Sequence, residues 1–159
     1  MKNLLLFGLV SLFLGMTGMR LPGSQHRDVK EDIRDKFVGG WRLVSLETEG
    51  ADGKVHHSDS TGLLTFTRDG HMSVHIMERN PQPEAPVGPE QYSQGGYEAS
   101  FGTYEVEEIT HTFNFHVEGG LVRTLIGKDL RRSFEFSGNL LIVKPTRPDE
   151  HWRVVWKHY

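Results

Sequence analysis

The sequence contains no cysteine in its 159 residues. This absence excludes a thiol nucleophile and the cysteine-containing ligand sets of structural zinc sites. It also excludes the N-terminal cysteine that lipoprotein processing requires. A chain of this length can bury enough apolar surface to fold without disulfides, so the absence does not identify the cellular compartment.

The sequence also lacks an excess of either charge. Its formal net charge is −3, and acidic and basic residues are spread along the chain without a basic stripe. We therefore expect no nucleic-acid partner. There is no Gly-x-Ser-x-Gly motif and no glycine-rich phosphate loop, which excludes two common kinds of catalytic or nucleotide-binding site. No cofactor is predicted.

Only one long hydrophobic run is present, over residues 4–14. It follows Lys2 and precedes several small residues, which is the anatomy of a secretory signal peptide. The run is too short to cross a bilayer comfortably. We expect residues 1–24 to be a signal peptide and the mature protein to be exported, periplasmic or secreted, without a stable membrane span. An uncleaved N-terminal anchor is the alternative.

Helical patterning is also scarce. Residues 25–36 are polar, but Val29, Ile33 and Phe37 recur at intervals of four. This spacing predicts the apolar stripe of a short helix, with Asp28 as its N-cap. Such a helix would close one end of the domain that follows. A polar linker without regular structure is the alternative.

Strand-like runs dominate the rest of the chain. Asp69-Gly70 and Ser137-Gly138 mark tight turns between β-prone segments. The spacing predicts an all-β domain over residues 37–159, with about eight or nine antiparallel strands in a closed up-and-down barrel or a sandwich. The predicted strands cover residues 41–49, 62–67, 71–77, 101–107, 110–118, 128–136, 139–144 and 152–157, with a stretch of uncertain type at 121–126.

One connection differs from these tight turns. Residues 78–97 contain Pro81, Pro83, Pro86 and Pro89, and no central strand tolerates this density of proline. A long connection of this kind either covers a binding site or is a solvated excursion.

Several strand motifs together carry a family resemblance. They are GWRLVS at 40–45, GLLTFT at 62–67, DGHMSV at 69–74, FGTYEV at 101–106 and HVE at 116–118. These motifs resemble the bacterial and fungal lipocalin-like domain family of the calycin group. The resemblance implies a lipocalin-like β-barrel and does not imply one activity. It also implies that Trp41 marks the plugged end of the barrel, with Arg153 stacked on its indole. Residues 121–125 depart from the family, where a Phe-Pro-Asn-Trp-like stretch is expected.

Strand alternation separates an apolar row from a polar row in most strands. In a soluble barrel the apolar rows face inward and would line a site for a small molecule. Arg132 lies on such a row, and a buried guanidinium needs a partner. That partner is either the carboxylate of a ligand, an internal carboxylate such as Glu105, or solvent at a strand end. Tyr104 would either join Arg132 or belong to the core. The predicted ligand-binding residues are Arg132, Tyr104, Phe113, Phe115, Phe134, Phe136 and Met72.

A second hypothesis uses the polar rows. If these rows faced inward, His75, His116 and Glu105 could converge as acid–base groups of an isomerase or cyclase acting on an apolar substrate. Otherwise they are surface or cross-strand residues. The histidines do not indicate a metal site, because His71 and His75 share a face but lie about 13 Å apart along a strand. We therefore predict no metal.

The sequence as a whole predicts an exported lipocalin-like protein that binds a small, mostly apolar molecule, with or without a carboxylate. An isomerase or cyclase in the same cavity is the first alternative. A filled barrel that serves as an interaction module is the second, and it would contain no cavity.

Overall fold

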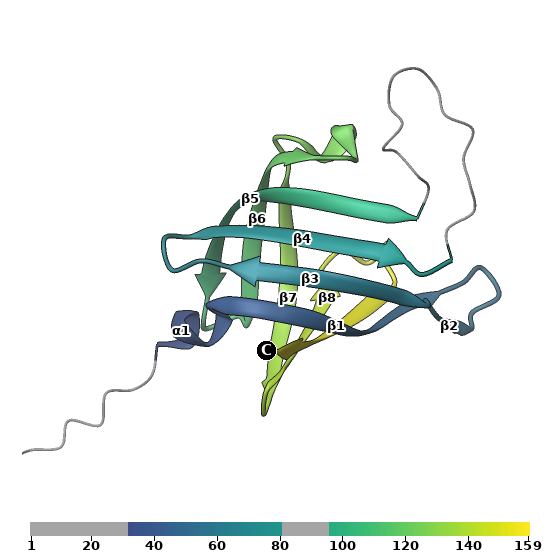
Figure 1. Cartoon of the computed structure of the whole chain (residues 1–159), viewed down its shortest axis with the longest axis horizontal. Coiled ribbons are helices and arrows are strands. Elements are labelled where there is room, and N and C mark those ends of the chain that lie inside the picture. The colour runs from purple at the N-terminus through teal and green to yellow at the C-terminus, as the bar shows by residue number, and fades with distance from the viewer. Residues whose placement is uncertain (1–31, 81–95) are drawn as a thin grey trace, which may run out of the picture. The chain divides into compact units, whose positions relative to one another are not determined.

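The structure is a computed structural model that describes residues 32–80 and 96–159. The predicted signal peptide, Asp28, Val29 and most of the proline-rich connection lie outside these residues. Within them the chain forms nine strands, one short α-helix and one 3₁₀ turn (Figure 1). The elements are α1 (Ile33–Phe37), β1 (Gly39–Glu49), β2 (Val55–His57), β3 (Ser60–Phe66), β4 (His71–Glu78), β5 (Tyr97–Glu107), β6 (Thr112–Gly120), η1 (Arg123–Leu125), β7 (Asp129–Ser137), β8 (Leu140–Pro145) and β9 (Trp152–His158).

The strands form a closed antiparallel barrel. Their order is β2-β1-β3-β4-β5-β6-β7-β8-β9, and an additional pairing of β1 with β9 closes the sheet on itself. The closing ladder runs from Trp41 opposite His158 to Thr48 opposite Trp152. Eight strands therefore make the barrel, while β2 pairs with the far end of β1 outside it. The barrel prediction is confirmed, and the sandwich is excluded because no sheet edge separates β1 from β9.

Helix α1 plugs one end of the barrel. The Asp32 side chain accepts a hydrogen bond from the backbone N–H of Arg34 at 3.0 Å, so Asp32 caps the described helix rather than the predicted Asp28. Phe37, the last helical residue, is fully buried. Its ring makes edge-on contacts with the rings of Phe66, Phe113, Phe134 and Phe136 at centroid distances of 4.9–5.7 Å. In Figure 1, α1 lies at the end of the barrel where β3 turns into β4.

Trp41 lies at this plugged end, as the resemblance implied. Its indole Nε1 donates a hydrogen bond to the Phe37 carbonyl at 2.7 Å, which ties the helix to β1. The predicted stacking of Arg153 on this indole is wrong. The β1–β9 register places Arg153 opposite Glu47, near the other end of the ladder, where the two form an ion pair at 3.2 Å. His158 takes the place next to Trp41, with ring centroids 4.7 Å apart.

Some element boundaries differ from the predicted ones. β5 begins four residues earlier than predicted, at Tyr97. His111 was assigned to a strand, but its φ of 51° places it in the turn before β6. The stretch of uncertain type contains η1. β2 was missed because it has only three residues, all exposed, and carries no apolar alternation.

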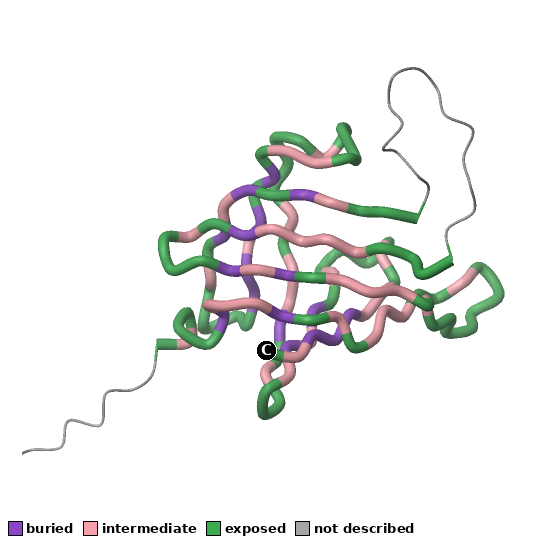
Figure 2. Tube along the Cα trace, in the orientation of Figure 1, coloured by how far each residue is buried: buried purple, intermediate pink, exposed green. Residues whose placement is uncertain are grey.

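The apolar rows face the interior, as the alternation predicted. Figure 2 shows buried positions along the strands and exposed positions at the connections. The buried core comprises Phe37, Trp41, Leu64, Phe66, Met72, Tyr104, Phe113, Phe115, Val117, Phe134, Leu141, Val143, Val154 and Trp156. Because every large strand contributes to this one cluster, the barrel has a single core with α1 as its floor.

Candidate functional site: the barrel cavity

The barrel interior contains a cavity of about 320 Å³. Its wall is mostly apolar and comes from the inward rows of all eight barrel strands. At one end, which we call the mouth, its wall consists of Thr48, Glu98, Arg132 and Trp152; Thr48 and Glu98 are exposed there. The full lining is Leu46, Thr48, Leu64, Met72, Val74, Ile76, Glu98, Ser100, Phe113, Phe115, Leu130, Arg132, Val143, Trp152, Val154 and Trp156.

Four of the seven predicted ligand-binding residues line this cavity. Met72, Phe113, Phe115 and Arg132 are among its wall residues. The other three, Tyr104, Phe134 and Phe136, are not.

Tyr104, Phe134 and Phe136 are instead packed around Phe37 at the plugged end, with ring centroids 4.9–6.2 Å from its ring. The Tyr104 hydroxyl donates to the Thr67 carbonyl at 3.0 Å, and burial raises the pKa of this phenol. Alternation thus identified the face of each residue correctly but not its depth in the barrel.

An ion pair lies at the mouth. Arg132 Nη1 is 2.8 Å from Glu150 Oε2, and both side chains are largely buried, with exposed fractions of 15% and 22%. The guanidinium also lies over the Trp152 ring, 5.0 Å from its centroid, a geometry that favours a cation–π interaction. Burial lowers the pKa of Arg132, and the opposing charges of Glu150 and Glu98 counteract that effect.

Glu150 is the partner that the sequence left open for Arg132. An internal carboxylate was one of the alternatives, but Glu105 was the wrong example. Glu105 is exposed on β5, opposite Asn114, whereas Glu150 belongs to the connection between β8 and β9. No periodicity applies to a connection, so this contact could not be predicted from the sequence pattern.

Glu98 is the second carboxylate that sequence reasoning missed. It pairs with Ile76 across β4 and β5 and shares the inward row of Ser100 at the start of β5. The strand was predicted to begin at Phe101, so this row was cut short. Extending the alternation backwards through Ser100 would have found Glu98.

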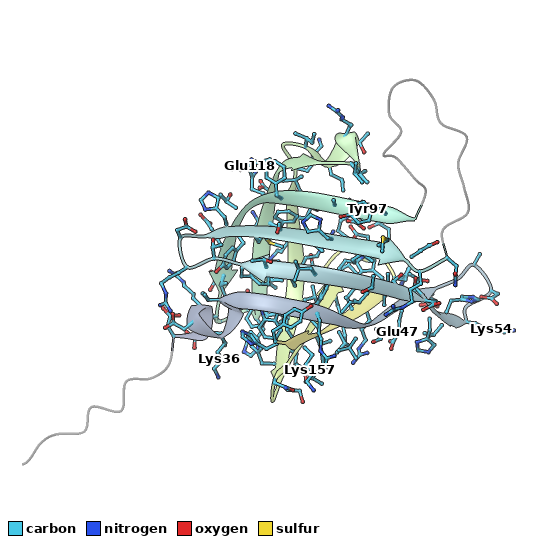
Figure 3. All side chains as sticks on the ribbon, in the orientation of Figure 1. Lys36, Glu47, Lys54, Tyr97, Glu118 and Lys157 are labelled. Atoms are coloured by element: carbon cyan, nitrogen blue, oxygen red, sulfur yellow. The ribbon has the colours of Figure 1, made fainter. Side chains whose placement is uncertain are left out.

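The three acid–base candidates do not meet in the cavity. None of them is part of its wall. His75 Nδ1 lies 3.0 Å from the hydroxyl oxygen of Tyr97. Tyr97 is the first residue of β5 and is labelled in Figure 3. His116 Nδ1 lies 2.9 Å from Asp129 Oδ1, and that contact lowers the pKa of Asp129. The polar rows that carry these residues face outward, so the arrangement on which the isomerase hypothesis depends is not formed.

A larger hollow, of about 770 Å³, lies outside the barrel between α1 and the β3–β4 turn. Its wall is strongly charged and includes Arg34, Arg68 and Asp69. Arg68 is already paired with Asp35 at 2.6 Å. The hollow also adjoins Asp32, where the described part of the chain begins. For a small apolar molecule the barrel cavity is therefore the better site.

Two further observations concern the described residues alone. They contain no group of three or more His, Asp or Glu side chains placed to hold a metal ion. None of their helices has the length and hydropathy needed to cross a membrane.

Comparison with known proteins gives a family and several solved relatives. The model of the family described as lipocalin-like domain matches residues 38–157. A lipocalin-like protein from Bacteroides uniformis is similar at 14% identity, with 78% of this chain and 99% of that chain covered and a TM-score of 0.48. An uncharacterised protein from Bacteroides eggerthii has 15% identity, coverage of 77% and 99%, and a TM-score of 0.46. A point mutant of the fluorescent protein UnaG has 15% identity, coverage of 79% and 97%, and a TM-score of 0.38. No curated protein matches the chain.

Proposed function

The chain belongs to the lipocalin-like domain family, and from this premise we propose that it binds one small, mostly apolar molecule inside the barrel. The observation that carries the proposal is the cavity of about 320 Å³ with its largely apolar wall. A barrel of this size either fills its interior with side chains or holds one small ligand. A filled barrel would not leave this space, which argues against the interaction-module alternative.

The cavity volume and wall define the kind of ligand. Burying one methylene group contributes roughly 0.8 kcal/mol, so an eight-carbon chain gains about 6 kcal/mol before the cost of association. Such a ligand needs few polar contacts, and three of the four polar side chains of the wall, those of Thr48, Glu98 and Arg132, lie at the mouth. Trp152 and Trp156 line the cavity, so their fluorescence reports directly on an occupant.

Filling the cavity tests this proposal. Val74 points into it from β4, whereas Val44 on β1 is 54% exposed. The variant V74F places extra volume in the cavity, and V44F makes the same exchange on the outer surface. We expect V74F to weaken binding of the neutral fluorophore N-phenyl-1-naphthylamine at least tenfold, and V44F to leave it unchanged. Equal affinity in both variants would contradict binding inside the barrel.

Whether the ligand carries a carboxylate is a separate question. The test is whether Arg132 contributes to binding of a carboxylate. Nη1 of Arg132 already donates to Glu150, so a ligand carboxylate would have to displace Glu150 or share the guanidinium with it. If the ligand did use this cation, Arg132→Ala would reduce the affinity for octanoate more than for octanol. Equal losses of affinity for octanoate and octanol would show that Arg132 does not recognise a ligand carboxylate.

We also propose that the protein is exported, on the basis of residues 1–24 alone. The support is the sequence pattern of a basic residue, an apolar run and small residues. Intact mass analysis of the protein recovered from its native host outside the cytoplasm should give a chain that begins between about residues 17 and 25. A chain that retains Met1 and stays with the membrane would support the uncleaved anchor instead.

A further inference from the structure

The two carboxylates at the mouth are in different situations. Glu150 contacts several donors of the protein: its Oε2 accepts from Arg132 Nη1 at 2.8 Å and from Trp152 Nε1 at 3.2 Å. Its Oε1 lies 3.5 Å from Arg147 Nε. Oε2 of Glu150 therefore already accepts two hydrogen bonds from the protein, and Oε1 lies beside a second guanidinium.

Glu98 has no such partners. It lines the cavity and is exposed, and no hydrogen bond or ion pair joins it to another residue of the described ranges 32–80 and 96–159. Burial lowers the pKa of Arg132, and the nearby charge of Glu98 opposes that shift, but Arg132 is already paired with Glu150. Glu98 is thus a carboxylate at the mouth to which no described residue donates a hydrogen bond.

The carboxylates near Arg132 are unevenly paired. Glu150 lies against both Arg132 and Arg147, and Asp149 pairs with Arg147, whereas Glu98 forms no ion pair with a described residue. An anionic headgroup placed here would be repelled, whereas a cationic donor would complete the pairing.

We propose that the ligand is an amphiphile with a protonated amine, whose apolar part fills the cavity while its ammonium group donates to Glu98 at the mouth. This inference rests on the proposed function, because it takes binding in the barrel as given. The class of headgroup follows from the carboxylate of Glu98. Arg132 is not used to assign it, because Glu150 already neutralises its charge. An ammonium group offers three donors on one small centre, which suits a carboxylate at an open rim.

Three probes of equal chain length separate the headgroups. Octylamine, octanol and octanoate are compared at pH 7 by displacement of N-phenyl-1-naphthylamine from the full chain. We expect octylamine to bind about fivefold more tightly than octanol, as a partly exposed charge pair allows, and octanoate to bind more weakly than octanol. The preference for the amine should decrease at high salt.

The variant E98Q removes the charge and keeps the shape. It should abolish the preference for octylamine over octanol that the wild type shows. E107Q is the matched control, since Glu107 is an exposed residue of the same strand outside the cavity wall, and it should preserve the preference for the amine. Both positions are exposed, so both variants should unfold at the wild-type temperature.

The outcomes are distinguishable. If octanol and octylamine bind equally well to the wild type, or if E98Q keeps the preference for the amine, the assignment of the headgroup is overturned and binding of an apolar ligand stands. If octanoate is preferred, the Arg132 option is correct instead. If none of the three displaces the fluorophore, the proposed function itself fails and takes this inference with it.

Discussion

Arg132 shows how one residue on an apolar row is made compatible with the core. The guanidinium is mostly buried, and the protein provides both an anion in Glu150 and an aromatic face in Trp152. Removing one partner of such a pair leaves a poorly solvated charge, which costs more than the pair itself contributes. The pair is therefore a structural element of the mouth before it is a candidate for recognition.

This coupling predicts a non-additive effect on stability. E150Q should lower the free energy of unfolding by about 1–3 kcal/mol, because it leaves Arg132 without its anion. The double variant with R132M and E150Q should lose less free energy of unfolding than the sum of the losses in the two single variants. Urea denaturation of R132M, E150Q and the double variant measures these losses.

The exposed pair of Arg68 and Asp35 is the control. These side chains are 77% and 45% exposed, so R68M should change stability by no more than about 0.5 kcal/mol. If R68M and E150Q lost similar amounts of free energy of unfolding, burial of the Arg132–Glu150 pair would have no energetic consequence.

Helix α1 acts at the scale of one element. It has only five residues and is too short to be stable alone. Its position depends on the burial of Phe37 and on the hydrogen bond from the Trp41 indole to the Phe37 carbonyl. The sequence predicted this plug from the spacing of Ile33 and Phe37, because a helical stripe is a local pattern.

Truncating the plug should therefore be costly. Phe37→Ala removes a fully buried ring with edge-on contacts to several others, and we expect a loss of about 3–5 kcal/mol in the free energy of unfolding. Ile109→Ala, at a position that is 90% exposed, should change it by less than about 0.5 kcal/mol. Chemical denaturation followed by tryptophan fluorescence provides both values.

A β-bulge between β5 and β6 leaves no room for a side chain at one position of β5. The register between β5 and β6 shifts between Phe101 and Gly102, and a methyl group on Gly102 would overlap the His116 carbonyl oxygen. Gly102→Ala should thus destabilise the barrel strongly, since the obstacle is backbone that cannot move aside. Gly40→Ala meets only the edge of the Tyr159 ring at 3.4 Å and should be tolerated. Thermal unfolding of the two variants tests the difference.

At the scale of the whole molecule, the strand pattern predicted either a closed barrel or a sandwich, and the family resemblance implied the barrel. Strand alternation also predicted which rows face inward. It did not specify height along the barrel. Phe134 and Phe136 lie on the same inward row as Arg132, yet they pack at the plug and Arg132 lies at the mouth. Alternation repeats every two residues and carries no information on the stagger between strands, which determines depth. Glu150 was beyond prediction for a different reason, since its position depends on the path of a connection.

Acid should destabilise the molecule through its surface carboxylates. Hydrogen bonds lower the pKa of Asp52, Asp69, Asp129 and Asp149 below the ordinary value of 3.8. A carboxylate with a lowered pKa in the folded state contributes stability above its unfolded pKa, and this contribution is lost as the pH falls through the folded pKa. The urea midpoint should therefore fall as the pH is lowered below about 4. In Asp129→Asn the urea midpoint should fall less steeply with decreasing pH. An unchanged slope would contradict a contribution of the Asp129 carboxylate to this pH dependence.

Methyl NMR with octanol as the probe tests whether a small apolar molecule is held inside the barrel. We expect saturable shifts and intermolecular NOEs at Val74, Ile76 and Leu130, which line the cavity, and none at the exposed Val44 and Val55. Shifts confined to Val44 and Val55, or the absence of a saturable response at the cavity methyls, would contradict binding inside the barrel.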